Sequence, residues 1–205
     1  MPKNGIGSWV HFDEKFEVDD AGLRSLADKN DGKLMLPNGI PFKTLGETGA
    51  KNIAFTSQWD NFPREITIPL NGQSSHVYLL MAGSTNQMQS RFTNGEIIVT
   101  YTDNSTEKLT LENPTNWWAI DQDYFIDDFA FNRPEAIPPR VDLKTGNVRI
   151  LDLADFKGKG KKVSGGAATV LDLPLDANKE LKSLTVRTIA NEVIIGLMSV
   201  TLVRN

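Results

Sequence analysis

Hydrophobic and polar residues alternate over several short segments of the chain, and this two-residue period is typical of β-strands with one buried face. The clearest case is 65–70, where Ile66, Ile68 and Leu70 share one face. Residues 76–82 are almost continuously apolar, as expected for a central strand that is covered on both faces. The other strands that this pattern predicts are 53–56, 96–102, 105–111, 147–153, 169–175, 180–190 and 193–203, with one or two short ones within 7–18.

Dipeptides that favour turns separate these segments. Asn71-Gly72 follows one predicted strand, Asn94-Gly95 precedes another, and Asp103-Asn104 lies between two. Hairpins at this spacing belong to an antiparallel sheet. Residues 19–31 are predicted to form one helical turn at most, and no segment has the sustained apolar spacing of a helix longer than about 10 residues. We therefore predict an all-β fold, a two-sheet antiparallel β-sandwich of jelly-roll type.

The chain has 205 residues, a size at which β-sandwiches commonly form a single domain, so we predict one domain over 1–205. Its N-terminal segment, 1–50, is less regular than the rest. Within it, Asn38-Gly39 and two prolines predict a loop over 34–42. Proline removes donors from a sheet, so 133–140, with three prolines, is predicted to be a loop as well.

One long connection, 113–129, interrupts the alternation of strands and turns and is rich in aromatic and acidic residues. If Trp117 and Trp118 are extended, their side chains point to opposite faces, so we expect one to be buried and the other at least partly open. An exposed indole suits the C–H face of a sugar ring, and Tyr124, Trp59 and Trp9 would extend such a carbohydrate-binding surface. Packing in the interior is the ordinary alternative for a tryptophan in a large sandwich.

Four carboxylates follow the two tryptophans, namely Asp121, Asp123, Asp127 and Asp128. They are open to three interpretations: solvated loop residues and turn caps, a structural Ca²⁺ site that draws several oxygens from one loop, or a glycosidase pair across a cleft. The spacing fails the EF-hand pattern, because Ile126 stands where glycine is required. We favour the first interpretation, then calcium, and catalysis last.

Composition narrows the possible functions. A net charge of −4 gives no electrostatic case for binding to nucleic acid or an anionic membrane, which would require a basic face. The most apolar segment, 193–203, is too short to span a bilayer, and Met1–Gly5 lacks the apolar core of a signal peptide. The absence of cysteine excludes disulfides and thiolate metal sites.

The chain has only two histidines, and they are far apart in the sequence, so neither a His-x-x-x-His metal site nor a Ser-His-Asp triad is indicated. We assign no catalytic residue. His76 stands at the head of an apolar strand, so we expect a partnered core or edge histidine there.

Three groups of residues carry a resemblance to a known family. The first is Gly-Ile-Pro-Phe at 39–42 with the predicted strands at 66–70 and 77–83. The second is 95–103 with Asn-Trp-Trp at 116–118 and Gln-Asp-Tyr at 122–124. The third is 165–173. From Gly39 onwards the chain resembles the C-terminal galactose-binding-like β-sandwich domain of large secreted Bacteroidetes proteins of an uncharacterised family that is associated with glycoside hydrolases.

The resemblance implies a jelly roll that acts as a non-catalytic carbohydrate-binding or accessory module of a polysaccharide-degrading system. The location it implies is extracytoplasmic, in the periplasm or at the cell surface, and the expected partner is a glycan or a neighbouring catalytic domain. The alternative is a structural domain that packs against that catalytic domain through the aromatic segment, and a glycosidase in its own right is least favoured. We expect no nucleic acid and no membrane insertion, and structural Ca²⁺ is the one cofactor considered.

Overall fold

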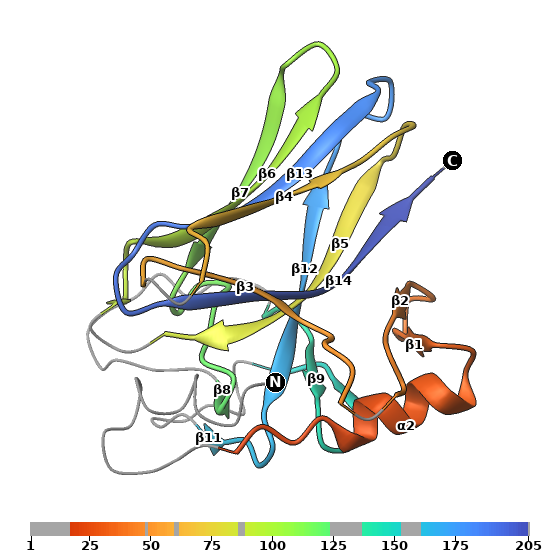
Figure 1. Cartoon of the computed structure of the whole chain (residues 1–205), viewed down its shortest axis with the longest axis vertical. Coiled ribbons are helices and arrows are strands. Elements are labelled where there is room, and N and C mark those ends of the chain that lie inside the picture. Colours follow the sequence, from red (N-terminus) through yellow and green to blue (C-terminus); the bar gives the residue numbers. More distant parts are fainter. Residues whose placement is uncertain are drawn as a thin grey trace.

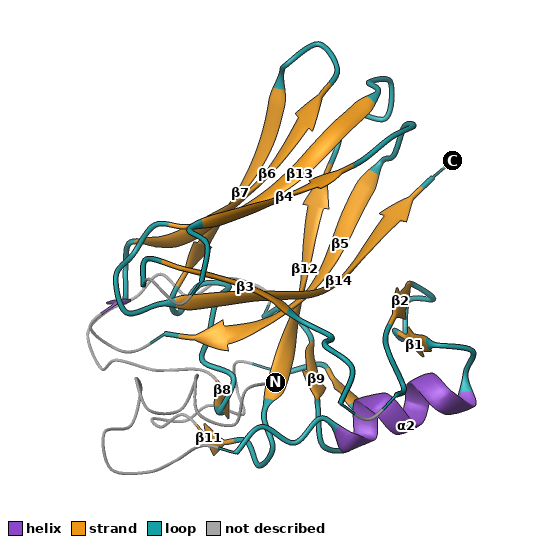
Figure 2. Cartoon of the chain, in the orientation of Figure 1, coloured by secondary structure: helices purple, strands orange, loops and turns teal. Residues whose placement is uncertain are grey.

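The computed structural model describes residues 17–47, 49–59, 62–85, 89–123, 137–152 and 161–204. Over these residues the fold is an all-β sandwich of antiparallel strands with one α-helix, which confirms the predicted fold class (Figures 1 and 2). Its jelly-roll connectivity, its likeness to galactose-binding domains and its single-domain organisation stay predictions.

Two sheets form the sandwich. The six-stranded sheet contains, in spatial order, β10 (Val148–Arg149), β9 (Arg140–Asp142), β12 (Ala167–Pro174), β5 (His76–Ser84), β14 (Ile194–Val203) and β3 (Ala54–Ser57). The four-stranded sheet contains β4 (Glu65–Pro69), β13 (Leu181–Thr188), β6 (Thr93–Tyr101) and β7 (Thr106–Glu112). Two small pairs complete the described strands: β1 (Lys33–Met35) with β2 (Pro41–Lys43), and β8 (Gln122–Asp123) with β11 (Lys161–Lys162).

The main hydrophobic core lies between the two sheets. Alternation places Val77, Leu79 and Met81 of β5 in this core, together with Ile97 and Val99 of β6. The remaining members come from β6, β7, β12, β13, β14, the β13–β14 connection and the segment after β7: Tyr101, Leu111, Leu171, Leu173, Leu181, Leu184, Val186, Ile195, Leu197, Ala190, Val193 and Trp117. Burial of one face per strand is what the two-residue period predicts.

A second core covers the outer face of the six-stranded sheet. It contains Leu80 and Ala82 of β5, against which helix α2 (Ala21–Lys29) and the β1–β2 hairpin pack, with Leu23 and Phe42 among the contributing side chains. In Figure 1, α2 and the hairpin lie on the side of this sheet away from the four-stranded sheet. The nearly continuous apolar run of β5 is thereby explained, because both faces of that strand are covered.

The prediction of one helical turn at most over 19–31 is wrong, since α2 has nine residues. Its stability comes from tertiary contacts that propensity does not reveal. Leu23 is buried in the second core, and Arg24 hydrogen-bonds to Asp20 and to the Ala50 carbonyl. Gly22, the second residue of the helix, lets the first turn approach the segment after β9 closely, because a Cβ there would lie 2.3 Å from the carbonyl oxygen of Lys144.

Other local predictions also differ from the structure. The predicted loop over 34–42 is a β-hairpin, with Gly39 at a φ of 82° in its turn. Asn94-Gly95 lies within β6 and not before it. The glycine serves packing there, because a Cβ at position 95 would lie 2.1 Å from Cδ1 of Ile195. The strand predicted over 147–153 is confined to Val148–Arg149 among the described residues. Of the predicted loop 133–140, only 137–140 are described, and Arg140 already belongs to β9.

Candidate functional site

The described part of the aromatic and acidic segment, 113–123, buries both of its tryptophans. Trp117 is 0% exposed and Trp118 3%, so the prediction that one of them is open is wrong. The premise of that prediction was an extended chain, but residues 114–116 form a turn in which the amides of Asn116 and Trp117 both donate to the Glu112 carbonyl. Because of this turn, adjacent side chains are not forced to opposite faces of a sheet.

The two indoles have different surroundings. Trp117 belongs to the core between the sheets. Trp118 lies beside Arg140, whose guanidinium carbon is 5.9 Å from the ring centroid, a distance at which a cation interacts with the ring electrons. Neither ring offers a face on which a sugar can stack.

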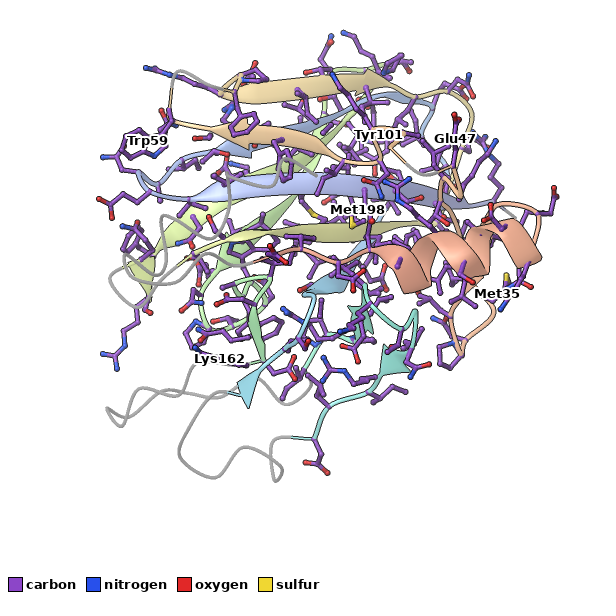
Figure 3. All side chains as sticks on the ribbon, turned by 60° about the horizontal axis from the view of Figure 1, so that its bottom comes forward. Met35, Glu47, Trp59, Tyr101, Lys162 and Met198 are labelled. Atoms are coloured by element: carbon purple, nitrogen blue, oxygen red, sulfur yellow. The ribbon has the colours of Figure 1, made fainter. Side chains whose placement is uncertain are left out.

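Of the other aromatic candidates, the structure describes Trp59. Tyr124 and Trp9 lie outside the described residues. Trp59 is 40% exposed, and Figure 3 shows it at the opposite end of the molecule from Met35, with Met198 between them. Because Trp117 and Trp118 are buried, they do not form one exposed binding platform with Trp59.

Of the four acidic candidates, Asp123 takes part in a buried ion-pair network. Its carboxylate accepts from two nitrogens of Arg149, at 2.6 Å (Nη1–Oδ2) and 3.0 Å (Nη2–Oδ1), and the Nε of Arg140 lies 3.7 Å from its Oδ1. Nε of Arg149 also donates to Asp142 at 2.8 Å. This bidentate arrangement is the strong form of an arginine–carboxylate contact, and it joins β8, β9 and β10.

Arg140 is the most deeply buried cation of this network, at 1% exposure. It donates to the Thr169 hydroxyl and to the carbonyls of Ala119 and Gln122, at 3.0, 3.1 and 3.1 Å. Burial lowers the pKa of the Arg140 guanidinium to about 10, and the charge of Asp123 acts in the opposite direction. The network ties the aromatic segment to the six-stranded sheet, which is a structural role.

The predicted calcium site stays a prediction. Asp121 and Asp123 are both buried, and Asp123 already has two guanidinium partners. Within the described part of the chain, no three carboxylate or imidazole groups gather closely enough to hold a metal ion. Asp127 and Asp128 lie outside the described residues.

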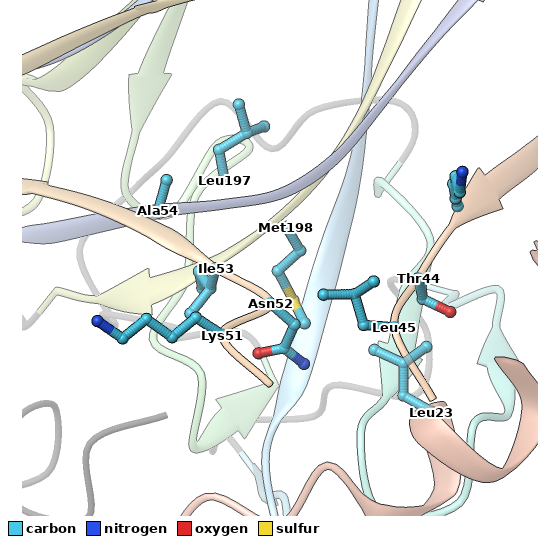
Figure 4. A pocket seen from close by; sticks show the side chains of 10 residues that line it. Leu23, Thr44, Leu45, Lys51, Asn52, Ile53, Ala54, Leu197 and Met198 are labelled. Carbon is cyan, nitrogen blue, oxygen red and sulfur yellow. The ribbon is translucent and has the colours of Figure 1, made fainter. Parts of the chain in front are cut away.

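One pocket among the described residues, which we call the α2 pocket, has a volume of about 420 Å³ (Figure 4). It is lined by Leu23 of α2, residues 43–45 and 51–54, and Leu197 and Met198 of β14. Arg24 holds the loop that forms one wall, because it donates to the carbonyls of Glu47 and Ala50. In Figure 4 the ammonium of Lys51 points away from Met198, so the interior of the pocket is mainly apolar.

A second pocket, which we call the β5–β12 groove, lies on the outer face of the six-stranded sheet and has a volume of about 300 Å³. Tyr78, Asp172 and Val170 come from the two adjacent strands, and Tyr78 is paired directly with Asp172 across them. The turn of the β1–β2 hairpin contributes one wall and the region around β9 and β10 the other: Leu36, Pro37 and Asn38 from the hairpin, and Pro139 and Ile150 from that region.

The polar groups of the groove converge on Asp172. Its Oδ1 lies 2.9 Å from Nδ1 of His76, and the imidazole of His76 is nearly parallel to the ring of Tyr78, with centroids 6.0 Å apart and an angle of 21° between the planes. Partial burial raises the pKa of the Tyr78 phenol, and the charge of Asp172 and a hydrogen bond to it add to the shift. The expectation that His76 is a partnered histidine at the head of its strand is confirmed.

This groove was missed by the sequence analysis. His76 and Tyr78 alternate on one face of β5, and Asp172 is a polar position in an otherwise apolar strand, so each element of the site had a local signal. The pairing of Tyr78 with Asp172 had none, since it depends on the register of two strands far apart in the sequence.

No family model matches the chain, and no curated protein matches it. Among the described residues, no helix has the length and apolar character needed to cross a membrane.

Proposed function

We propose that the chain is a non-catalytic carbohydrate-binding module of a polysaccharide-degrading system, that it acts outside the cytoplasm, and that it binds glycan in the β5–β12 groove. The observation that carries this proposal is the Tyr78–Asp172 pair, an aromatic ring beside a carboxylate at the base of an open groove. The extracytoplasmic location rests on the family resemblance described above.

Sugar recognition requires two kinds of contact, and the groove has groups for both. An aromatic ring packs against the C–H face of a pyranose, while carboxylate and amide oxygens accept from its hydroxyl groups. Tyr78 provides the first kind and Asp172 and Asn38 the second. The volume of about 300 Å³ lies at the lower end of the range for small-molecule sites, which suits one or two sugar units of a longer chain.

The groove also supports a binding role over a catalytic one. Glycoside hydrolysis generally uses two carboxyl groups, about 5–9.5 Å apart, on either side of the scissile bond. Among the described residues that line the groove, Asp172 is the single carboxylate. A binding module needs no second acid.

The test is binding to a panel of soluble polysaccharides, measured by affinity electrophoresis and then by titration calorimetry. Tyr78→Leu retains apolar bulk at a partly buried position but removes the flat ring. A stacked ring contributes about 1 kcal/mol beyond its buried area, so the affinity should fall about fivefold or more. Ile189→Ala is the matched control, because Ile189 is 43% exposed and does not line the groove.

Two results would overturn this proposal. One is a Tyr78→Leu variant that melts like the wild type and binds with unchanged affinity. The other is a wild-type chain that binds no polysaccharide of the panel.

The α2 pocket favours a second candidate function, docking against a neighbouring catalytic domain. The pocket is mainly apolar and Leu45 at its rim is 44% exposed, as expected for a site that receives an apolar side chain of a partner. A photoreactive amino acid at position 45 should then cross-link to a glycoside hydrolase domain in cells that express both. If only Tyr78→Leu has an effect and position 45 yields no cross-link, docking at this pocket is rejected.

A further inference from the structure

We propose that Asp172 makes the β5–β12 groove selective for neutral glycans and excludes acidic ones, such as polymers rich in uronic acids. This inference rests on the proposed function, since it concerns the class of polysaccharide that the same groove accepts. It assigns to Asp172 a role in specificity in addition to hydrogen bonding.

The first observation is the charge of the groove. Asp172 is the one carboxylate in its lining, and no lysine or arginine lines it within the part of the chain that the structure describes. The other groups with polar side-chain atoms are Tyr78 on the adjacent strand and Asn38, which line the groove, and His76, whose Nδ1 lies 2.9 Å from Asp172. A bound uronate would therefore meet a carboxylate without a guanidinium or ammonium partner to bind it.

The second observation is the position of that carboxylate relative to the ring. Tyr78 and Asp172 are directly opposite each other on adjacent strands, and such pairs have Cβ atoms about 4.5–5.5 Å apart. A pyranose packed on Tyr78 thus extends its ring substituents towards Asp172. A hydroxyl or hydroxymethyl group there can donate to the carboxylate, whereas a C6 carboxylate can only repel it.

The expected preference for a neutral over an acidic glycan depends on the distance between the two carboxylates and on how far Asp172 is exposed to solvent. In bulk water, the repulsion between two unit charges 4 Å apart corresponds to about a fivefold loss of affinity. The side chain of Asp172 is 39% exposed, so its charges are screened less than in bulk water and the loss should be larger. We expect at least about a tenfold preference for the neutral glycan at low salt, which should shrink at high salt.

The experiment compares each neutral polysaccharide that the full chain binds with the same polymer after oxidation of its C6 hydroxymethyl groups to carboxylates. Galactomannan is a suitable starting polymer. The pair shares a backbone and differs in charge. Affinities are measured by titration calorimetry in 20 mM and in 500 mM NaCl, and circular dichroism melting verifies that each variant is folded.

Asp172→Asn is the central variant, because it removes the charge at nearly constant shape and keeps a hydrogen-bonding partner for His76. It should reduce the preference from about tenfold to less than about threefold, mainly by improving the affinity for the oxidised polymer. Ile150→Lys adds a cation at a wall residue that is 72% exposed and should likewise improve binding of the oxidised polymer. Ile189→Lys adds the same charge away from the groove and should not.

His76→Gln removes the titratable neighbour of Asp172 and leaves the carboxylate in place. The preference for the neutral polymer should persist in this variant. The inference is overturned if the wild type binds both polymers equally, if Asp172→Asn keeps the full preference, or if the preference disappears in His76→Gln. Equal binding of both polymers with a loss in Tyr78→Leu would leave the carbohydrate-binding function intact. Absence of binding to any polymer would reject that function and this inference together.

Discussion

Replacing Trp118 by alanine should destabilise the fold by about 3–5 kcal/mol, the usual cost of removing a large aromatic side chain from a core. Trp118 is 3% exposed and lies against the guanidinium of Arg140, which is itself buried. The truncation therefore opens a cavity and also removes an aromatic neighbour of a buried cation. Both effects act on the folded state.

The loss can be measured by thermal melting and by urea denaturation. For a chain of this size, 1 kcal/mol corresponds to a Tm shift of about 2–4 °C, so Trp118→Ala should lower Tm by roughly 6–20 °C. Trp117→Ala should have an effect in the same range, because Trp117 lies in the core between the sheets. Trp59→Ala is the control, since Trp59 is 40% exposed and its loss should cost less than about 1 kcal/mol.

A spectroscopic measurement tests the same burial without cavity formation. The chain has four tryptophans, so a Trp9→Phe, Trp59→Phe double variant leaves Trp117 and Trp118 as the only ones. Their fluorescence should resist quenching by acrylamide. Strong quenching, or a Trp118→Ala variant that melts within about 2 °C of the wild type, would contradict the burial of this residue and restore it as a candidate stacking surface.

Three further predictions concern charge. Asp123→Asn should destabilise the fold by about 3–5 kcal/mol in urea denaturation, because Arg140 then loses the counter-charge of a buried pair; an unchanged midpoint would mean that the network is not buried in solution. The pKa of Asp103 is lowered to about 2, first by donation from the Ser105 hydroxyl and then from its amide. This lowered pKa stabilises the folded state above pH 4 and the effect is lost as the pH falls towards 2, so an NMR titration should find the Asp103 midpoint near 2 and a higher one in Ser105→Ala. If Asp121, Asp123 and their acidic neighbours hold Ca²⁺, a hundredfold excess of the ion over Kd should stabilise the fold by about 2.7 kcal/mol, and equal Tm values in EDTA and in millimolar calcium would reject that site.

In the β5–β12 groove, local sequence patterns determine which residues share a face of a strand, and tertiary contacts determine which residues of other strands lie beside them. The alternation of His76 and Tyr78 in β5 placed them on one face, and this follows from the chain itself. Which residue lies opposite Tyr78 is decided by strand register, and Asp172 is its neighbour because β12 and β5 pair across 94 positions of sequence. The aromatic pattern in the sequence therefore indicated Trp117 and Trp118 as a site, although their burial depends on how the segment after β7 turns.

What the sequence determined by itself is the class of the fold and most of its strands. The period of two in 65–70 and the apolar run in 76–82 are local signals, because a strand needs only its own side chains to distinguish a buried face from an exposed one. The structure accordingly has β4 and β5 where the pattern predicts them.

Only the tertiary structure decided the features that depend on distant partners. Helix α2 forms because its apolar face is buried on the six-stranded sheet and Arg24 anchors a loop more than 20 residues away. Trp117 and Trp118 are both buried because a turn before them lets one enter the core between the sheets and the other pack beside Arg140. Local periodicity reports which side of an element is apolar, but burial depends on what the rest of the chain brings against that side.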